Sequence, residues 1–129
     1  MPVASDQSRR FVFMGSINAF LAVALGAFGA HGLKAMLSPQ ALQTWQTAFE
    51  YHIYHALGLI LIALLLDILP KARIAGWLML AGIILFSGSL YLLALSGIKM
   101  LGMITPLGGL CFLAAWAWLA LLSLRTKRG

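Results

Sequence analysis

FVFMGSINAFLAVALGAFGAHGL, residues 11–33, contains no Asp, Glu, Lys or Arg and decides the fold class of this chain. A helix needs about 20 mostly apolar residues to cross a hydrocarbon core of roughly 30 Å, and this run is long enough. Ser8, Arg9 and Arg10 precede it, as basic residues precede a secretory signal. The run is longer than the ~7–15 apolar residues of such a signal, and more apolar runs follow. The stretch therefore predicts a first membrane span.

The composition of the whole chain agrees with lipid as its solvent. Of 129 residues, 62% are hydrophobic and 9% are charged, and the mean hydropathy is +0.96. A soluble domain carries about 25% charged residues. The net charge of +6 comes from short basic clusters between apolar runs, not from a basic stripe that would bind nucleic acid. We expect the lipid bilayer as the main partner and no nucleic acid.

Three more apolar runs complete a single domain over residues 1–129. The expected spans are residues 11–33, 50–69, 74–98 and 103–124. Ser38 and Pro39 predict the start of a helix, because serine caps helix N-termini and proline suits the first helical position. Residues 39–50 then form an amphipathic segment, which either lies on the membrane surface or continues into the second span. The predicted fold is an all-α integral membrane four-helix bundle with this amphipathic helical extension before the second span.

The basic residues also predict an orientation. Seven lie on one side of a four-span chain and two on the other. The seven are Arg9, Arg10, Lys71, Arg73, Arg125, Lys127 and Arg128, and the two are Lys34 and Lys99. Basic residues concentrate on the cytoplasmic side of membrane proteins. We therefore expect a multi-pass protein of the cytoplasmic (inner) membrane with both termini in the cytoplasm.

Small residues recur on one face of the first span and mark where helices can pack closely. In lipid, helices associate through small residues that let backbones approach one another. We expect helix-packing roles for Gly15, Ala19, Ala22, Gly26, Gly29, Gly82, Gly88 and Gly109.

Most polar side chains of the spans fall toward one leaflet and form the candidate site. Its candidate binding residues are His31, Glu50, Tyr51, His55, Ser87, Ser89 and Tyr91. We expect His31 to lie within hydrogen-bonding or one-water reach of the cluster formed by Glu50, Tyr51, His55, Ser89 and Tyr91, because an unpartnered imidazole in lipid is costly. His31, His52 and His55 are the candidate ligands if a metal such as zinc or copper binds. A structural polar network is the favoured interpretation of the same side chains, and a metal site is the alternative.

Five motifs resemble a family of small bacterial inner-membrane proteins of unknown function, the YgdD-like family, which has a short eukaryotic transmembrane relative. The motifs are LGAFGAHG at 25–32, WQTAFEYHIYH at 45–55, FSGSLYLLALSG at 86–97, TPLGG at 105–109 and FLAAWAWL at 112–119. The family's recurring positions match here as Gly26, Gly29, His31, Trp45, Tyr51, His55, Ser87, Gly88, Ser89, Tyr91, Pro106 and Gly109. The resemblance implies four spans in the cytoplasmic membrane, with no established activity, and it does not require His52.

Three classes of function stay open. The favoured one is an accessory or structural membrane component that binds protein or lipid, either as a homo-oligomer or with another membrane protein. The first alternative is a carrier or channel component for a small solute or proton, with the polar cluster as its site. The second is a metal- or haem-binding membrane protein. The sequence shows no nucleophile triad, phosphate loop or zinc-protease motif, so we expect no cofactor and do not favour an enzyme.

Overall fold

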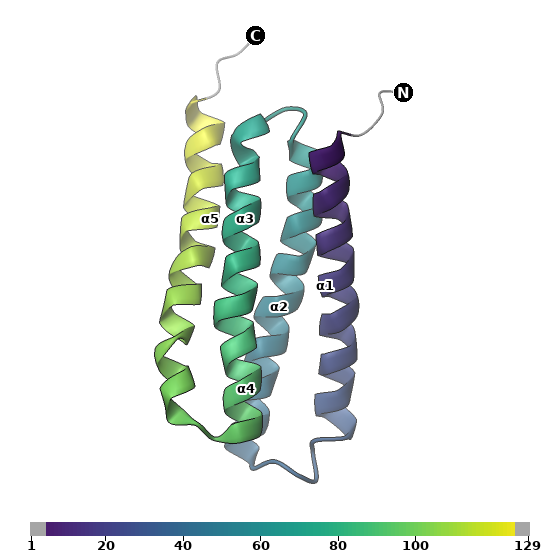
Figure 1. Cartoon of the computed structure of the whole chain (residues 1–129), viewed down its shortest axis with the longest axis vertical. Helices are drawn as coiled ribbons and strands as arrows, with labels where there is room; N and C mark the ends of the chain where they lie inside the picture. Colours follow the sequence, from purple (N-terminus) through teal and green to yellow (C-terminus); the bar gives the residue numbers. More distant parts are fainter. Residues whose placement is uncertain (1–4, 126–129) are drawn as a thin grey trace.

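The computed structural model describes residues 5–125, and within this range all regular structure is helical (Figure 1). The long helical stretches stand side by side, and α1 begins at the same end of the bundle where α5 ends (Figure 1). The elements are α1 (Asp6–His31), α2 (Pro39–Leu65), η1 (Pro70–Ala72), α3 (Arg73–Gly82), η2 (Ile83–Gly88), α4 (Ser89–Ser96), η3 (Lys99–Met103) and α5 (Thr105–Arg125). Four helical stretches in the described chain are long and apolar enough to cross a membrane.

The helix ends follow from local sequence. The Ser5 hydroxyl accepts the Ser8 N–H at 3.0 Å, and the Ser38 hydroxyl accepts the Ala41 N–H at 3.1 Å. The amphipathic segment 39–50 is the first part of α2, which runs without a break to Leu65. We expected this helix to reach Leu69, but it ends at Leu65. Leu69 itself leaves the helical conformation, with φ −129° and ψ 81°, because the residue before a proline is biased away from it.

The third span is one helical run whose hydrogen bonding changes in its middle. Residues Ile83–Gly88 form a π-helix, η2, between the α-helices α3 and α4. π-Helices are rare in proteins, and those that occur are often found at functional sites. Gly97 then ends α4 with a φ of 71°, a left-handed conformation that glycine adopts without the steric cost of a Cβ.

The small-residue face of α1 packs against α2, as predicted. Its buried positions Ser8, Gly15, Ala22 and Gly29 recur every seven residues, a spacing typical of left-handed helix packing. A Cβ on Gly15 would stand 2.6 Å from Cγ1 of Ile60 and 2.8 Å from the Ala56 carbonyl oxygen.

The other predicted packing glycines divide into two groups. Gly26 and Gly29 lie against the rings of Phe49 and Trp45 on α2, and Gly82 lies against the Phe112 ring. Ala19 is half-buried. Gly88 and Gly109 leave ordinary van der Waals space for a Cβ, so neither marks a close helix contact. Near the start of α5, the residue that approaches η2 closely is Gly108, which was not predicted from the sequence as a packing residue.

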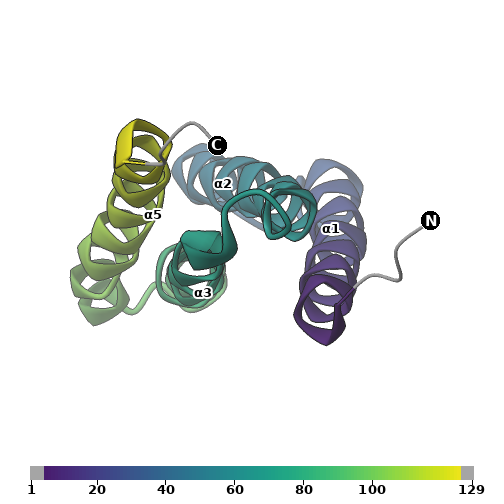
Figure 2. The ribbon, with the colours of Figure 1, turned by 90° about the horizontal axis from the view of Figure 1, so that it is seen from above.

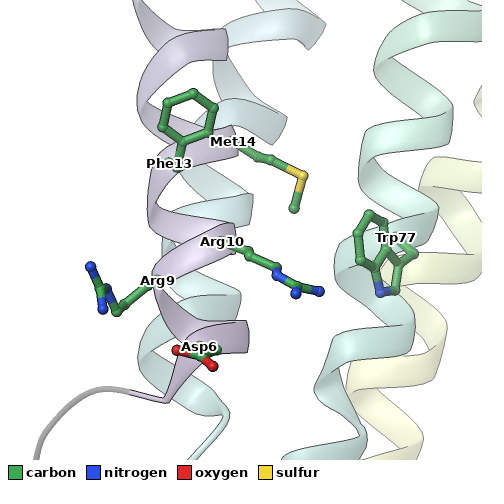
Figure 3. A pocket seen from close by; sticks show the side chains of 6 residues that line it. All are labelled: Asp6, Arg9, Arg10, Phe13, Met14 and Trp77. Carbon is green, nitrogen blue, oxygen red and sulfur yellow. The ribbon is translucent and has the colours of Figure 1, made fainter.

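The α1 backbone packs closely only along α2, and α5 packs along α3 and η2. Seen from the end, α1 and α3 lie apart, with α2 between and behind them (Figure 2). The Phe11 ring crosses this space to Gly76 and to Trp77, whose ring centroid is 5.3 Å away. A pocket opens beside it at the start of α1 (Figure 3).

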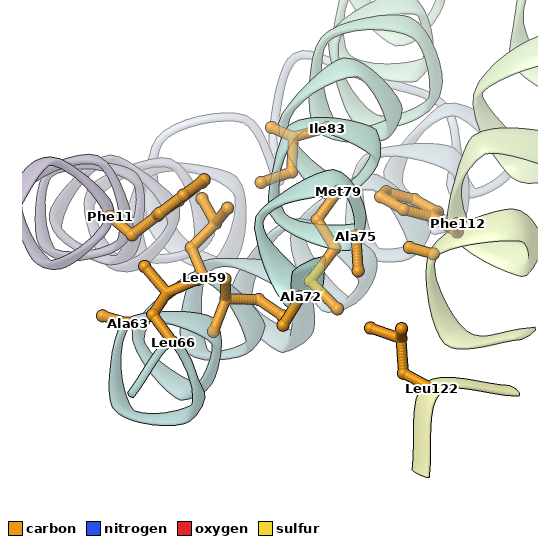
Figure 4. Packing of buried hydrophobic residues seen from close by; sticks show 12 residues of the cluster. Phe11, Leu59, Ala63, Leu66, Ala72, Ala75, Met79, Ile83, Phe112 and Leu122 are labelled. Carbon is orange, nitrogen blue, oxygen red and sulfur yellow. The ribbon is translucent and has the colours of Figure 1, made fainter. Parts of the chain in front are cut away.

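The main core fills the half of the bundle nearer to the start of α1. It contains Leu59 and Ala63 of α2, Ala75 and Met79 of α3, and Phe112 of α5 (Figure 4). A second cluster lies in the other half around Trp45, Ala48 and Tyr91. Between the two clusters the bundle interior contains polar side chains.

Candidate functional site

His52 holds the centre of a polar chain that joins three of the four spans. Its Nδ1 lies 3.0 Å from the Tyr91 hydroxyl on α4, and its Nε2 lies 3.0 Å from Oδ1 of Asn18 on α1. The Asn18 amide nitrogen donates to the Met14 carbonyl oxygen at 2.8 Å. His52 and Tyr91 are buried and Asn18 is half-buried. This row of hydrogen-bonded side chains, which we call the polar chain, is the main polar connection between α1 and the third span.

The chemistry of its members fixes the direction of the chain. Because the Asn18 amide nitrogen donates to Met14, its Oδ1 is the atom that accepts from His52. His52 therefore carries its proton on Nε2, and Nδ1 accepts the Tyr91 O–H. Both ring nitrogens of His52 are used, which leaves no nitrogen for a metal ion in this conformation.

The polar chain lies at half-depth in the bundle. His52 is as far from the first residue of α2 as from the last, and Asn18 lies equally close to the middle of α1. Helices of 26 and 27 residues are about 40 Å long at 1.5 Å per residue, which matches a bilayer with its headgroup regions. Polar and ionisable side chains so deep in a membrane are costly and usually mark a functional site. The sequence placed the polar groups nearer to one surface.

Ser87 lines a groove beside this chain and has no partner for its hydroxyl. Its side chain is 0% exposed, and its Oγ is the buried side-chain atom without a hydrogen-bond partner among the described residues. Ser87 lies in the π-helix η2. A buried hydroxyl with no partner costs about 1–3 kcal/mol, so this atom is a candidate contact for a ligand or an ordered water molecule.

We call this space the half-depth groove. Its volume is about 450 Å³, and it lies between α1 and the η2–α4 region. The polar residues that line it are Asn18, His52, Ser87, Ser89 and Tyr91, and the apolar ones are Leu25, Ile83, Ile84, Leu85, Gly88, Leu92, Leu101 and Ile104. No residue of this lining carries a formal charge.

His55 lies in a separate environment, on the part of the α2 surface that faces α5. Its Nδ1 donates to the Tyr51 carbonyl oxygen at 2.7 Å, and its Nε2 accepts the Trp116 indole N–H at 3.0 Å. Indole N–H groups only donate, so His55 carries its proton on Nδ1. The ring stacks on Phe112 at 3.6 Å between centroids with a 7° interplanar angle. An aromatic groove of about 560 Å³ opens here between Tyr51, Phe86 and Trp116.

The remaining predicted residues are spread over the molecule. His31 is exposed and has no hydrogen bond or ring contact within residues 5–125. The expected approach of His31 to the cluster is therefore wrong. His31 follows the buried Gly29 by two residues, which is about 200° around the helix, so its side chain points away from α2. Glu50 accepts a hydrogen bond from the Gln46 amide at 3.3 Å, and it is half-buried.

Ser89 belongs to a third contact, on the side of α5. Its hydroxyl lies 2.6 Å from the Thr105 hydroxyl and donates to the Phe86 carbonyl oxygen at 2.9 Å. Across the described residues, no three His, Cys, Asp or Glu side chains gather where they could hold a metal ion. The structure thus brings Ser87, Ser89 and Tyr91 together beside His52, and separates them from His31, Glu50 and His55.

Sequence reasoning gave too little weight to two residues of the site. Asn18 is not among the candidate binding residues predicted from the sequence, and His52 is included only as a candidate metal ligand. The signal that could have found them is their position: each lies midway along a long apolar helix, where polar side chains are rare.

The fold and the groove together define a class: small four-span helical membrane proteins with a polar chain at half-depth. The chain belongs to the family described as "Protein of unknown function (DUF423)", which matches residues 25–109. The narrower likeness to YgdD-like proteins and to a eukaryotic relative stays a prediction.

Bacterial relatives cover most of the chain. It is 55% identical over 109 residues to the UPF0382 membrane protein YwdK of Bacillus subtilis, and the match covers 82% of this chain and 89% of that protein. It is 45% identical over 116 residues to the UPF0382 membrane protein SERP0230 of Staphylococcus epidermidis, which covers 89% and 95% of the two chains. No solved structure matches this chain.

Proposed function

We propose that this protein is an accessory component of the cytoplasmic membrane that binds a lipid-soluble molecule in the half-depth groove. The single observation that carries this proposal is the fully buried, unpartnered hydroxyl of Ser87 beside the His52–Tyr91 pair. Apolar pockets with a few placed polar groups are the usual form of ligand sites. The groove has this form and lies where membrane-dissolved molecules can enter it sideways.

The lining specifies the chemistry of the ligand. Its body is apolar, because leucine and isoleucine side chains make up most of the wall. The ligand carries a neutral hydrogen-bonding oxygen, either a carbonyl or a hydroxyl, because the Ser87 hydroxyl can both donate and accept. An ionised ligand group would need a charged partner, and the lining contains none. Tyr91 directs its proton to His52 and keeps lone pairs for a ligand donor.

The polar chain favours binding over transport. A carrier or channel needs polar groups or water that connect the site to both ends of the bundle. Here the chain passes from Tyr91 through His52 and Asn18, and it ends on the Met14 carbonyl oxygen. Large apolar side chains line the rest of the groove.

The test is ligand retention by the intact protein. The wild type and Ser87→Ala are extracted from bacterial membranes in a mild detergent, and co-purifying small molecules are quantified by mass spectrometry. Loss of a neutral hydrogen bond of about 0.5–1.5 kcal/mol should reduce ligand affinity roughly 2- to 10-fold. Ser16→Ala is the matched control, because Ser16 is exposed on α1 and does not line the groove.

The same variants give an independent stability readout. Without ligand, Ser87→Ala should unfold at the same or a higher denaturant concentration than wild type, because it removes a buried group that lacks a partner. If the wild type retains no lipid-soluble molecule, or if Ser87→Ala retains it as well as Ser16→Ala does, the proposal is wrong and an ordered water satisfies Ser87.

A further inference from the structure

A second pocket lies at the end of the bundle where α1 begins. Its volume is about 420 Å³. Asp6, Arg9, Arg10, Phe13 and Met14 of α1 line one side, and Trp77 of α3 lines the other. Arg10 and Met14 extend toward Trp77 across the space, and Arg9 points to the far side of the helix (Figure 3). We call this the α1–Trp77 pocket.

The pocket carries opposite charges that do not neutralise each other. Asp6 and Arg10 are four residues apart on one helix, a spacing at which a carboxylate and a guanidinium commonly pair. No ion pair joins them, or any other side chains, within residues 5–125. Both side chains are exposed. One positive and one negative group are therefore free at the rim of the same pocket.

The pocket also lies at the depth of lipid headgroups. Arg10 stands about 12 Å from the level of Asn18 along α1 at 1.5 Å per residue. Half of a ~30 Å hydrocarbon core is about 15 Å, so a long arginine side chain there reaches the phosphate level. Trp77 is half exposed beside it, and tryptophan is enriched at membrane interfaces.

We infer that the α1–Trp77 pocket binds the headgroup of an aminophospholipid such as phosphatidylethanolamine. The phosphate receives charge-assisted hydrogen bonds from Arg10, with Arg9 adding positive potential, and the primary ammonium donates to the Asp6 carboxylate. The acyl chains lie along Phe13, Met14 and the Trp77 ring. Asp6 distinguishes this lipid from a purely anionic one, which the carboxylate would repel.

The proposal concerns a different place and a different ligand from the half-depth groove. It predicts a preference among three headgroups. Phosphatidylethanolamine should bind more tightly than phosphatidylglycerol, which lacks the ammonium. It should also bind more tightly than phosphatidylcholine, whose methylated nitrogen has no N–H to donate to Asp6.

The experiment is lipid titration of the full chain by native mass spectrometry with these three lipids. Arg10→Gln should weaken binding of phosphatidylethanolamine about tenfold or more, because it removes a charged donor to the phosphate. Asp6→Asn should remove the preference for phosphatidylethanolamine over phosphatidylglycerol. The matched controls are Asp67→Asn and Arg73→Gln, which change exposed charges at the same end of the bundle outside the pocket and should leave the preference intact.

Two results would overturn the inference. One is wild-type protein that binds phosphatidylglycerol as tightly as phosphatidylethanolamine, which would indicate a general anionic-lipid surface. The other is an unchanged preference in Asp6→Asn. Ser87→Ala separates the two proposals, because it should reduce retention of the groove ligand and leave the headgroup preference as in wild type.

Discussion

Two adjacent glycines of α5 provide a matched test of helix packing. A Cβ placed on Gly108 would meet the backbone of Phe86 in η2, 2.7 Å from its Cα and closer still to its nitrogen. A Cβ placed on Gly109 would stand 3.8 Å from the Phe86 ring, in ordinary contact. A backbone cannot rotate away as a side chain can, so Gly108→Ala must push α5 and η2 apart, whereas Gly109→Ala needs no movement.

The comparison isolates the cost of that displacement. Both substitutions replace glycine by alanine near the start of the same helix, so the gain in helix propensity, about 1 kcal/mol each, cancels in the difference. Overpacking costs about 1–3 kcal/mol. Because the obstacle is backbone, we expect Gly108→Ala to be less stable than Gly109→Ala by an amount at the upper end of this range, about 2–3 kcal/mol.

Reversible unfolding in mixed micelles, with increasing fractions of a denaturing detergent, measures this difference. The two variants and the wild type are compared under the same lipid and detergent conditions. A Gly108→Ala protein that unfolds at the same detergent fraction as Gly109→Ala would refute the reasoning, because it would show that α5 does not approach η2 at Gly108.

Two further predictions test packing of the first span and orientation. Gly29→Leu should destabilise the protein in the same assay by more than Leu21→Ala. A leucine at position 29 must displace the Trp45 ring, whereas Leu21 is 45% exposed on the lipid-facing side of α1. Equal stability of the two variants would show that α1 does not pack through Gly29. Reporter fusions at the C-terminus and in the loop between α4 and α5 should show a cytoplasmic end and an external loop, from the seven-to-two distribution of basic residues. An active periplasmic reporter at the C-terminus would reverse that orientation.

The helices could be predicted from the sequence because lipid imposes simple rules. Long apolar runs and a capping serine each act locally, and the observed helices agree with them to within a few residues. The small-residue face of α1 was also predictable, since Gly15, Ala22 and Gly29 lie on one side of any helix. The π-helix was not, because the sequence of residues 83–88 carries no local signal for it.

The site was harder to predict because it depends on which residues of different helices share a level. His52 and His55 are three residues apart and look equivalent in the sequence, but His52 faces Asn18 and Tyr91, and His55 faces Trp116 and Phe112. The sequence therefore identified the polar residue types and many of their positions, but it could not divide them between the contacts of α2 with α1 and α4 and its contacts with α5.

The half-depth groove and the polar chain both result from the way α1 packs against α2 and not against α4. A membrane supplies no hydrophobic force between helices, because lipid tails are as apolar as leucine. Nothing therefore closes the space between α1 and α4 unless side chains there fit one another, and the α1 residues that fit are on the face toward α2. Asn18 reaches α4 only through His52. The same three side chains that tie α1 to the third span are thus part of the polar wall of the groove, so a ligand that binds Ser87 beside them would also fix how far α1 stands from α4.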